Sequence, residues 1–304
     1  MKAVVCTRYG SPDVLQLKEI AKPVPKDNEV LVKVYATTVT SGDVRMRSFN
    51  VPRLQWIPAR IYLGIRRPKR AVLGMELAGK IEAVGRNVRQ FKVGDAVFGS
   101  TLRSDFGGHA EYKCLPEDGL LAVVPPNISM EEAAAGPATG GVTAMVNLRK
   151  AKLKSGQKVL IYGASGSVGT FAVQICKQLG AHVTAVCSTG NIDLVKSLGA
   201  DRVIDYKRED FTASGAIYDV VFDAVGKLAA SYGKKALKPA GVYLNVNNTP
   251  NNLKLDDLLY LQSLFKAGRL KSVIDRQYPL EKLAEAHSYV DTGRKRGNVV
   301  ITVG

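Results

Sequence analysis

A glycine-rich run near the middle of the chain has the residue types and spacing of a phosphate-binding turn. The run is Gly163-Ala164-Ser165-Gly166-Ser167-Val168-Gly169, and it directly follows the apolar stretch Val159–Tyr162. Gly166 allows a backbone to approach a pyrophosphate, and Gly169 allows a helix to pack closely on a strand. The N-terminus of that helix offers N–H donors and a partial positive charge. The alternative is an ordinary strand–loop–helix turn, but the position directly after a strand favours dinucleotide binding by all seven residues.

The next apolar stretch, Val183–Cys187, ends without a carboxylate and continues as Ser188-Thr189-Gly190-Asn191. A site for NAD usually has Asp or Glu at this point to bind the ribose 2′-hydroxyl, and such a carboxylate would repel a 2′-phosphate. Ser188, Thr189 and Asn191 offer hydroxyl and amide donors instead, each worth about 1.5–3 kcal/mol to a charged acceptor. We therefore expect NADP(H) as the cofactor. If Ser188 and Thr189 only form a turn, NAD(H) and NADP(H) would bind similarly.

Strand-like and helix-like stretches alternate from residue 158 onward. The expected strands are Val159–Tyr162, Val183–Cys187, Val203–Asp205, Asp219–Asp223 and Val242–Val246. Between the first two, apolar residues recur at helical spacing from Val168 to Leu179, and Gly180 is placed to end that helix. This alternation predicts an α/β protein with a Rossmann-type doubly wound parallel sheet and crossover helices.

The regions before and after this alternation are expected to form a second domain. The first 124 residues contain short apolar stretches separated by turn residues, which is typical of β-structure. From Leu253 the chain has a helical stretch, a strand-like stretch, another helix and a final strand. We predict that residues 1–124 and 253–304 form one domain, and that residues 125–252 form the dinucleotide-binding domain.

The chain carries a formal net charge of +16, which is unusual for an enzyme that acts on small molecules. Such a charge can attract an anionic cofactor, nucleic acid or an acidic membrane surface, or it can be a solvated surface without a partner. Basic residues are densest from Arg60 to Arg70, where we favour an ordinary exposed segment. The longer stretch Phe49–Arg70 is apolar for a loop, and it could equally be a substrate lid or pack against core or a second subunit.

The four cysteines, Cys6, Cys114, Cys176 and Cys187, include no C-x-x-C pair. This spacing suits buried thiols in a reducing compartment better than a disulfide framework or a zinc knuckle. The sequence has no apolar run of about 18 residues and no signal-peptide pattern at its start. We therefore expect a cytoplasmic protein without a membrane span.

Four stretches, in this order along the chain, resemble landmarks of one family. They are Gly74–Gly85 with the following Val88, Phe91, Gly94-Asp95 and Val97, then Gly163–Gly169, then Asp219–Gly226, and finally Gly297-Asn298-Val299-Val300. Over nearly its whole length the chain is thereby similar to zinc-independent medium-chain dehydrogenases/reductases, in particular the quinone oxidoreductase branch that contains zeta-crystallin. The resemblance implies a GroES-like β-rich catalytic domain interrupted by the Rossmann domain, and commonly a homodimer or tetramer.

The resemblance also implies an activity, the NADPH-dependent reduction of quinones or α,β-unsaturated carbonyl compounds without zinc. Zinc-dependent relatives take their catalytic ligands from positions that here read Thr38–Thr40, Met75 and Ala135–Pro137. Met and Ala do not replace thiolate and imidazole ligands at such a site. The structural-zinc lobe with its four close cysteines is also missing, and we predict no metal site.

Reduction of these substrates places negative charge on oxygen, which a hydroxyl, amide or guanidinium can stabilise by roughly 3–4 kcal/mol. Thr40 and Arg45 lie on the loop that matches the family's active-site loop, and Tyr112 is a third candidate. Each would otherwise be a surface or loop-supporting residue. Asp43 is expected to orient the loop, and none of the three histidines is expected to be catalytic.

Family position adds residues to the cofactor site. Tyr206 is expected beside the adenosine phosphate, and Val225, Gly226 and Asn245 are expected near the nicotinamide. Asn298 would close over the cofactor from the C-terminal part of the chain.

The sequence departs from the family pattern at three places. A motif that often contains Asn reads Thr40-Ser41-Gly42-Asp43, and Gly190 stands where close relatives often have Arg. After Val242–Val246, relatives continue through a helix and a sixth strand. Only about six residues, Asn247–Asn252, are available here, too few for both at 1.5 and 3.3 Å per residue. We hypothesise that a stretch near Asn247–Asn252 is missing, which an intact mass matching this sequence would refute.

Two functions of another class stay open at this stage. The positive charge, together with the RNA binding known within the zeta-crystallin group, is compatible with an NADPH-binding protein that acts on nucleic acid, with an affinity that falls steeply with salt. The Arg60–Arg70 segment is compatible with a cofactor-binding protein that acts at a membrane surface rather than as a reductase.

Overall fold

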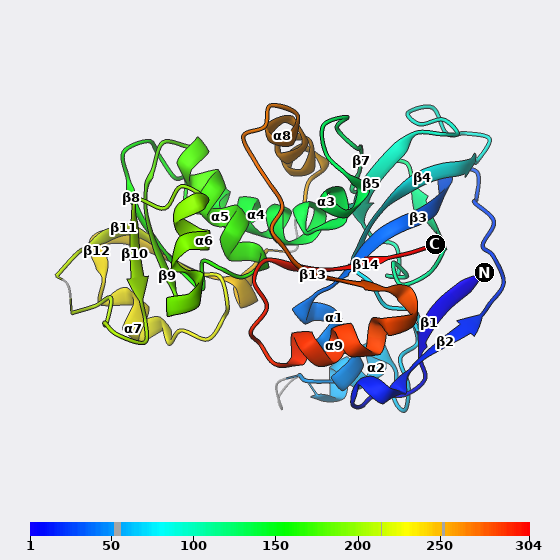
Figure 1. Ribbon diagram of the computed structural model, residues 1–304, viewed down its shortest axis with the longest axis horizontal. Coiled ribbons are helices and arrows are strands. Elements are labelled where there is room, and N and C mark those ends of the chain that lie inside the picture. The colour runs from blue at the N-terminus through cyan, green and yellow to red at the C-terminus, as the bar shows by residue number, and fades with distance from the viewer. Residues whose placement is uncertain (52–55, 214, 251–252) are drawn as a thin grey trace. The chain divides into compact units, whose positions relative to one another are not determined.

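The computed structural model describes residues 1–304 except 52–55, 214, 251 and 252. The chain divides into two compact units: unit 1 comprises Met1–Ala138 and Ile274–Gly304, and unit 2 comprises Thr139–Val273. Figure 1 shows the course of the chain through both units. Among the described residues, no helix is both long enough and apolar enough to cross a membrane.

Unit 1 is built on a mainly antiparallel sheet around β3 (Glu29–Val39). The first half of β3 pairs with β6 (Tyr112–Pro116), its second half pairs with β14 (Asn298–Thr302), and β4 (Glu76–Val84) runs along its other side. The sheet also contains β13 (Ile274–Pro279), β5 (Ala96–Ser100) and β7 (Leu121–Val123), in the order β13-β14-β3-β4-β5-β7. Because β4 and β14 run antiparallel to β3, the carboxyl end of β3 meets their amino ends.

The helices of unit 1 cover this sheet or flank it. Helix α1 (Ser41–Ser48) follows β3 directly and packs against α9 (Leu283–Asp291), which follows the 3-10 turn Leu280–Lys282. Helix α3 (Met130–Ala134) packs on β3 and β4. The remaining elements are the β1–β2 hairpin (Lys2–Cys6 and Leu15–Glu19) with the 3-10 turn Pro12–Val14, and α2 (Trp56–Leu63).

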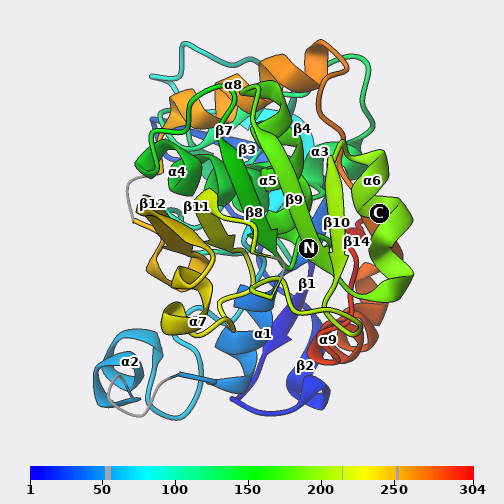
Figure 2. The ribbon, with the colours of Figure 1, turned by 90° about the vertical axis from the view of Figure 1, so that its left-hand side faces the viewer.

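Unit 2 contains the predicted parallel sheet. Its strands are β8 (Lys158–Tyr162), β9 (His182–Cys187), β10 (Arg202–Asp205), β11 (Tyr218–Asp223) and β12 (Leu237–Asn245). They pair in parallel in the order β10-β9-β8-β11-β12, and Figure 2 shows them side by side. The order reverses between β8 and β11, which is the position where doubly wound sheets bind ligands at their carboxyl edge.

The helices of unit 2 are α4 (Val142–Lys150), α5 (Ser167–Gln178), α6 (Ile192–Ser197), α7 (Ala230–Lys234) and α8 (Leu255–Lys266). The apolar stripe that predicted α5 packs on β8 and β9, with Phe171, Ala172 and Ile175 fully buried. A π-helical turn at Pro137–Gly141 and short 3-10 turns at Thr189–Asn191 and Val246–Asn248 complete the unit. The predicted fold class, a Rossmann sheet with a second β-rich domain, is confirmed.

The predicted domain boundaries differ from the two units at both junctions. Helix α3 was placed in the dinucleotide-binding domain, yet it packs on the sheet of unit 1. Helix α8 was expected to return to the first domain, yet it packs on α4, to which an ion pair between Arg149 and Asp257 joins it. Its Phe265 ring also lies 6.4 Å from the Phe171 ring of α5. Tertiary packing of these helices, which local pattern does not encode, sets both boundaries.

The sheet of unit 2 has five strands among the described residues, and β12 is the last of them. After β12 the chain forms the 3-10 turn Val246–Asn248 and then reaches α8, while residues 251 and 252 lie outside the described residues. The helix and sixth strand expected from the family pattern therefore do not form in the described part of the chain. The hypothesis that residues are missing here stays a prediction.

Candidate functional site

The glycine-rich run folds as a tight turn between β8 and α5. Gly163 has a φ of 76°, and a Cβ built on it would lie 1.9 Å from Val225 Cγ2. A Cβ on Gly169 would lie 2.3 Å from the carbonyl oxygen of Gly163. The protein itself therefore requires glycine at both positions.

Gly166 differs from these two glycines, because a Cβ on it would have no protein atom closer than 3.6 Å. Gly166 is the N-cap of α5, and within the described residues no side chain caps this helix. The space beside Gly166 and the N–H groups of the first turn of α5 suit the close approach of an anionic group. The turn has the form that the prediction requires, and binding of a pyrophosphate there stays a prediction.

The loop after β9 is tied to this turn by side chains. Asn191 Nδ2 donates to Ser165 Oγ at 2.9 Å and to Ser188 Oγ at 3.1 Å. Thr189 differs from its prediction as a donor to a 2′-phosphate, because its hydroxyl donates to Asp205 Oδ2 at 2.6 Å. That hydrogen bond is the main reason why the pKa of Asp205 is lowered. Asn191 Nδ2 likewise uses both of its protons in these contacts, whereas Ser188 Oγ accepts there and keeps its own hydroxyl proton for another acceptor. Binding of a 2′-phosphate by Ser188 and Asn191 stays a prediction.

Asp205 corrects the expectation that no carboxylate lies near the end of β9. Parallel pairing places Asp205 of β10 beside Cys187, so the carboxylate arrives from a strand that follows later in the sequence. Arg208 Nε lies 3.6 Å from Asp205 Oδ2, and both Lys207 and Arg208 are exposed. Tyr206 is half-exposed. The end of β10 thus offers an aromatic ring and two cations beside a single carboxylate.

Asp223 organises the loops on the other side of β8. Its buried carboxylate accepts hydrogen bonds from the N–H groups of Val225 at 3.1 Å and Gly226 at 2.8 Å, and from Asn245 Nδ2 at 3.0 Å. The structure thereby brings together the three residues that family position assigned to the nicotinamide. Sequence reasoning did not select Asp223, although an acid at the end of a parallel strand was the available signal.

In unit 1, the carboxyl end of β3 leads into a buried capping box. Thr40 is the N-cap of α1, and its Oγ1 accepts from the Asp43 N–H at 3.1 Å. The fully buried Asp43 accepts from Thr40 N and Oγ1 through Oδ2, at 2.8 and 2.6 Å, and from Gly74 N through Oδ1, at 2.9 Å. Asp43 therefore joins the start of α1 to the segment before β4. This contact is consistent with the predicted orienting role.

The positions where zinc-dependent relatives have ligands lie at this end of the sheet. Met75 Sδ lies 3.4 Å from Thr40 Oγ1, and Thr38 Oγ1 donates to Glu76 Oε1 at 2.6 Å. A backbone carbonyl, that of Ala135, accepts from Asn298. A hydroxyl, a thioether and a carbonyl are not a zinc donor set. Among the residues that the structure describes, no group of three or more His, Cys, Asp or Glu side chains could hold a metal ion.

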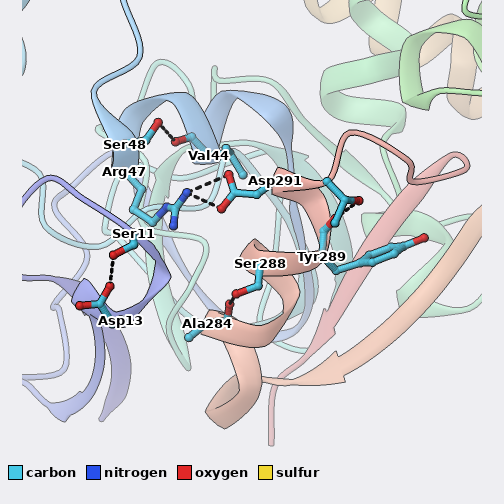
Figure 3. A network of polar contacts seen from close by, with 10 residues as sticks. Ser11, Asp13, Val44, Arg47, Ser48, Ala284, Ser288, Tyr289 and Asp291 are labelled. Carbon is cyan, nitrogen blue, oxygen red and sulfur yellow. Dashed lines mark hydrogen bonds and ion pairs between the residues drawn. The ribbon is translucent and has the colours of Figure 1, made fainter.

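Two arginines of α1 have different surroundings. Arg47 is buried, and its Nη2 donates to both carboxylate oxygens of Asp291, at 2.9 and 2.7 Å. Figure 3 shows this ion pair, which holds α1 against α9. Arg45, the predicted catalytic candidate, is exposed two residues earlier on the same helix. The pair at Arg47 thus fixes the helix from which Arg45 extends.

Tyr112 is not brought to this end of the sheet. It pairs with Lys33 at the start of β6, seven residues before Thr40 on the neighbouring strand, which corresponds to roughly 23 Å of extended chain. The Lys22 ammonium lies 3.8 Å from the centre of its ring. The geometry therefore favours Thr40 and Arg45 over Tyr112 as parts of one site.

Asn298 begins β14 and lies at the same end as Thr40. It is buried, and its Nδ2 donates to the Ala135 carbonyl oxygen at 2.8 Å. Just before it, Lys295 Nζ donates to the Gly297 carbonyl oxygen at 2.6 Å. Desolvation lowers the pKa of Lys295 to about 8, although the carboxylates of Glu76 and Asp275 favour its charged form. Sequence reasoning missed Glu76, because only the antiparallel pairing of β3 with β4 brings it beside Thr38. It also missed Lys295, which lies in the loop before β14 and interacts with Glu76.

The histidines have structural surroundings. His109 is buried in unit 1, with Nε2 2.9 Å from the Thr38 carbonyl oxygen, and its ring centre lies 5.8 Å from that of the buried His287. Burial lowers the pKa of both imidazoles. His182 is exposed at the start of β9.

Comparison with known proteins identifies the family. Residues 26–126 match the alcohol dehydrogenase GroES-like domain, and residues 167–274 match the zinc-binding dehydrogenase domain. The chain is 35% identical over 320 residues to the 2-methylene-furan-3-one reductase of Solanum lycopersicum, covering 99% of this chain and 79% of that protein. The chain belongs to the quinone oxidoreductase branch of the medium-chain dehydrogenases/reductases.

Two further relatives agree with this assignment. The NADPH-dependent alkenal/one oxidoreductase of Arabidopsis thaliana, a chloroplastic protein, is 32% identical over 99% of this chain and 79% of its own length. The quinone oxidoreductase structure from Coxiella burnetii superposes with a TM-score of 0.89 at 27% identity, over 100% of this chain and 99% of that one. The 320 aligned positions of the tomato relative exceed the 304 residues of this chain, so the relative has residues that this chain lacks.

Proposed function

We propose that this protein is an NADPH-dependent, zinc-independent reductase that transfers hydride to quinones or α,β-unsaturated carbonyl compounds. The observation that carries the proposal is the pair of residues at the positions where zinc-dependent relatives have metal ligands. Thr40 and Met75 contact each other there, and neither is a typical zinc ligand. The family relatives named above are an enone reductase, an NADPH-dependent alkenal/one oxidoreductase and a quinone oxidoreductase. Reduction of an activated C=C or a quinone is the chemistry that these names share.

The side chains at the carboxyl edge of unit 2 fit NADP(H), which supplies the hydride when bound. The run Gly163–Gly169 would hold the pyrophosphate, because space and N–H donors meet at Gly166. Ser188, Asn191 and the exposed Lys207 and Arg208 would hold the 2′-phosphate, with Arg208 also offsetting the charge of Asp205. Tyr206 would lie beside the adenosine. Val225, Gly226 and Asn245, fixed by Asp223, would border the nicotinamide. The role of Asn298 toward the cofactor stays a prediction from family position.

Arg45 is the proposed catalytic residue of unit 1. A guanidinium can donate hydrogen bonds to the carbonyl oxygen on which negative charge develops, and such a donor is worth roughly 3–4 kcal/mol. The hydroxyl proton of Thr40 is directed at Asp43, so Thr40 positions the loop better than it donates to substrate. The proton that completes the reduced product would come from solvent.

The activity is tested with purified protein, NADPH and a panel of an ortho-quinone, a para-quinone and a conjugated enone, in the presence of a chelator. We expect NADPH oxidation with at least one of these classes and a lower rate with NADH. Activity only with primary alcohols and NAD, or activity that the chelator abolishes, would contradict the proposal.

Arg45→Met tests the catalytic assignment. We expect kcat to fall about 100-fold, equivalent to the loss of one oxyanion donor. Affinity for NADPH should stay within about twofold, because the proposed role of Arg45 is to donate to the substrate oxygen and not to hold the dinucleotide. Arg89→Met, which removes an exposed arginine elsewhere in unit 1, is the matched control. An unchanged kcat for Arg45→Met would remove Arg45 from the mechanism.

The family assignment supports this reductase over a protein that acts on nucleic acid or at a membrane in place of catalysis. All four cysteines are free, which suits the reducing environment of the cytoplasm, the location we propose. Assembly as a homodimer or tetramer stays a prediction, for which light scattering is the measurement.

A further inference from the structure

The segment between β3 and β4 has an unusual charge composition. From Val44 to Met75 the sequence contains eight arginine and lysine residues and no aspartate or glutamate. Arg66, Arg67 and Lys69 are exposed among the described residues. A surface with one sign of charge attracts partners of the opposite sign.

The same segment exposes large apolar side chains. No residue of α2 is buried. Trp56 is 48% exposed, Ile57 68%, Ile61 64%, Tyr62 65% and Ile65 71%. Single exposed apolar side chains are ordinary, but five within ten residues form a patch of the kind that marks an interaction surface. We call these five residues, with Arg66, Arg67, Lys69 and Arg70, the α2 patch.

Specific contacts hold the α2 patch in shape. The Arg60 guanidinium lies over the rings of Tyr9, Phe49 and Trp56, at 4.7, 3.9 and 4.8 Å from their centres. Tyr9 Oη donates to the Gly64 carbonyl oxygen at 3.0 Å. The isoleucines therefore face solvent from a segment that is fastened to the rest of unit 1.

Apolar and cationic groups also share one hollow of the α2 patch. The hollow has a volume of about 620 Å³ and is lined by Pro58, Ile61, Tyr62, Lys69 and Arg70. Lys69 Nζ donates to the Ile61 carbonyl oxygen at 2.8 Å, and Arg70 forms an ion pair with Asp105. A ligand for this hollow needs an apolar part beside an anionic part.

We propose that the α2 patch docks this protein on an anionic phospholipid bilayer. Apolar side chains of an interfacial helix enter the boundary between headgroups and acyl chains, while flanking lysines and arginines bind the anionic headgroups. Helix α2 has eight residues and a length of about 12 Å, which suits binding on a bilayer rather than across it. This docking adds to the proposed reductase activity and does not depend on it.

The charge of the α2 patch argues against the other occupants. A second copy related by a two-fold axis would bring the arginines of both copies together, with no acidic residue of the segment to pair them. Nucleic acid would satisfy the cations, but it offers no apolar layer to cover Ile57, Ile61 and Ile65. Of these three occupants, the anionic lipid surface is the one that satisfies both kinds of side chain.

Vesicle co-sedimentation tests the proposal. We expect the full-length protein to pellet with vesicles of phosphatidylcholine and phosphatidylglycerol, less so at high salt, and to stay in the supernatant with phosphatidylcholine alone. No binding to the anionic vesicles, or equal binding to both kinds, would overturn the proposal.

Matched variants locate the surface. We expect Arg66→Glu combined with Arg67→Glu to weaken vesicle binding at least about tenfold, because each basic residue near an anionic surface contributes about 1 kcal/mol. Ile57→Ser with Ile61→Ser should weaken it about tenfold through lost apolar burial. The controls are Lys234→Glu with Lys235→Glu, an exposed pair in unit 2 with the same change of net charge, and Val24→Ser with Val93→Ser, two exposed valines of unit 1.

Each outcome bears on the proposal. Loss of binding in the α2 patch variants, with both controls within about twofold of wild type and thermal midpoints unchanged, supports it. Equal losses in the charge variant and its control would show a general effect of net charge and overturn it. An α2 patch variant that changes the oligomeric state but not vesicle binding would assign the surface to a second copy. RNA binding that the charge variant abolishes, without vesicle binding, would assign it to nucleic acid.

Discussion

The two site regions of this protein are built in different ways. In unit 2, the turn from Gly163 to Gly169 is made by one short stretch whose shape is set by backbone conformation and close backbone approach. In unit 1, the region around Thr40 combines the end of β3, the start of α1, the segment before β4 and the start of β14. The shape of the first region thus depends on backbone packing, and the shape of the second depends on side-chain contacts between distant segments. The two regions should therefore respond differently to substitution.

Gly169→Val should have the largest effect. The first added carbon would already lie 2.3 Å from the Gly163 carbonyl oxygen, so α5 would have to move away from β8. We expect the free energy of unfolding to fall by about 3 kcal/mol or more and NADPH binding to be lost. Chemical denaturation and fluorescence titration with NADPH measure the two effects. Gly166→Ala is the control, because the nearest atom is 3.6 Å away, and it should weaken NADPH binding with little change in stability. Equal destabilisation by both variants would contradict this distinction.

Asp43→Ala should have the next largest effect, and in unit 1. It leaves Thr40 N, Thr40 Oγ1 and Gly74 N without their acceptor. Each buried group left unsatisfied costs about 1–3 kcal/mol, so we expect a loss of roughly 3 kcal/mol in stability and at least a tenfold fall in kcat. The NADPH affinity of unit 2 should change little. A normal kcat in the folded variant would show that the start of α1 needs no anchor at Gly74.

Acid should destabilise unit 1 through its buried histidines. Burial lowers the pKa of His287, and the nearby His109 and Arg47 add to this effect. Below about pH 6.5 the unfolded chain therefore binds a proton that the folded chain does not, and stability falls as the pH decreases, by at most about 1.4 kcal/mol per pH unit for each histidine. Denaturation at pH 7.5 and 5.5 should show a smaller acid loss for His287→Leu than for wild type. The exposed His182→Asn should behave as wild type, and identical acid losses in all three proteins would rule out His287 as a source.

Gly190→Arg should have the smallest effect of the four variants, and it tests where the 2′-phosphate of NADPH binds. A side chain at Gly190 meets open space, so an arginine can be accommodated without strain. We expect NADPH to bind about tenfold more tightly, as one added charge-assisted hydrogen bond would give, while NADH binding stays unchanged. An equal gain for both dinucleotides would place the 2′-phosphate elsewhere.

The same contrast explains what the sequence could predict. The five strands of unit 2, the turn before α5 and the convergence of Val225, Gly226 and Asn245 follow from local pattern and family position. The role of Asp205 could not be predicted in this way, because its contact with Thr189 depends on parallel pairing between β9 and β10. Glu76 was missed because its contact with Thr38 depends on antiparallel pairing between β3 and β4, and Lys295 because it lies in a loop far from Glu76 in sequence. The sequence named Tyr112 as a third catalytic candidate but could not place it along its strand, because that position depends on the register of β6 with β3.

The shortened end of the unit 2 sheet affects how copies of this chain can meet. Strand β12 lies at the edge of the sheet among the described residues, and its pairing with β11 is interrupted between Leu237 and Val242. That interruption contains Lys238 and Pro239, and a break in register, a lysine and a proline all hinder the growth of a sheet across two molecules. A continuous sheet shared between two copies would have to pass through this irregular edge. If copies of this chain associate, we therefore expect them to do so through a surface other than the edge of β12.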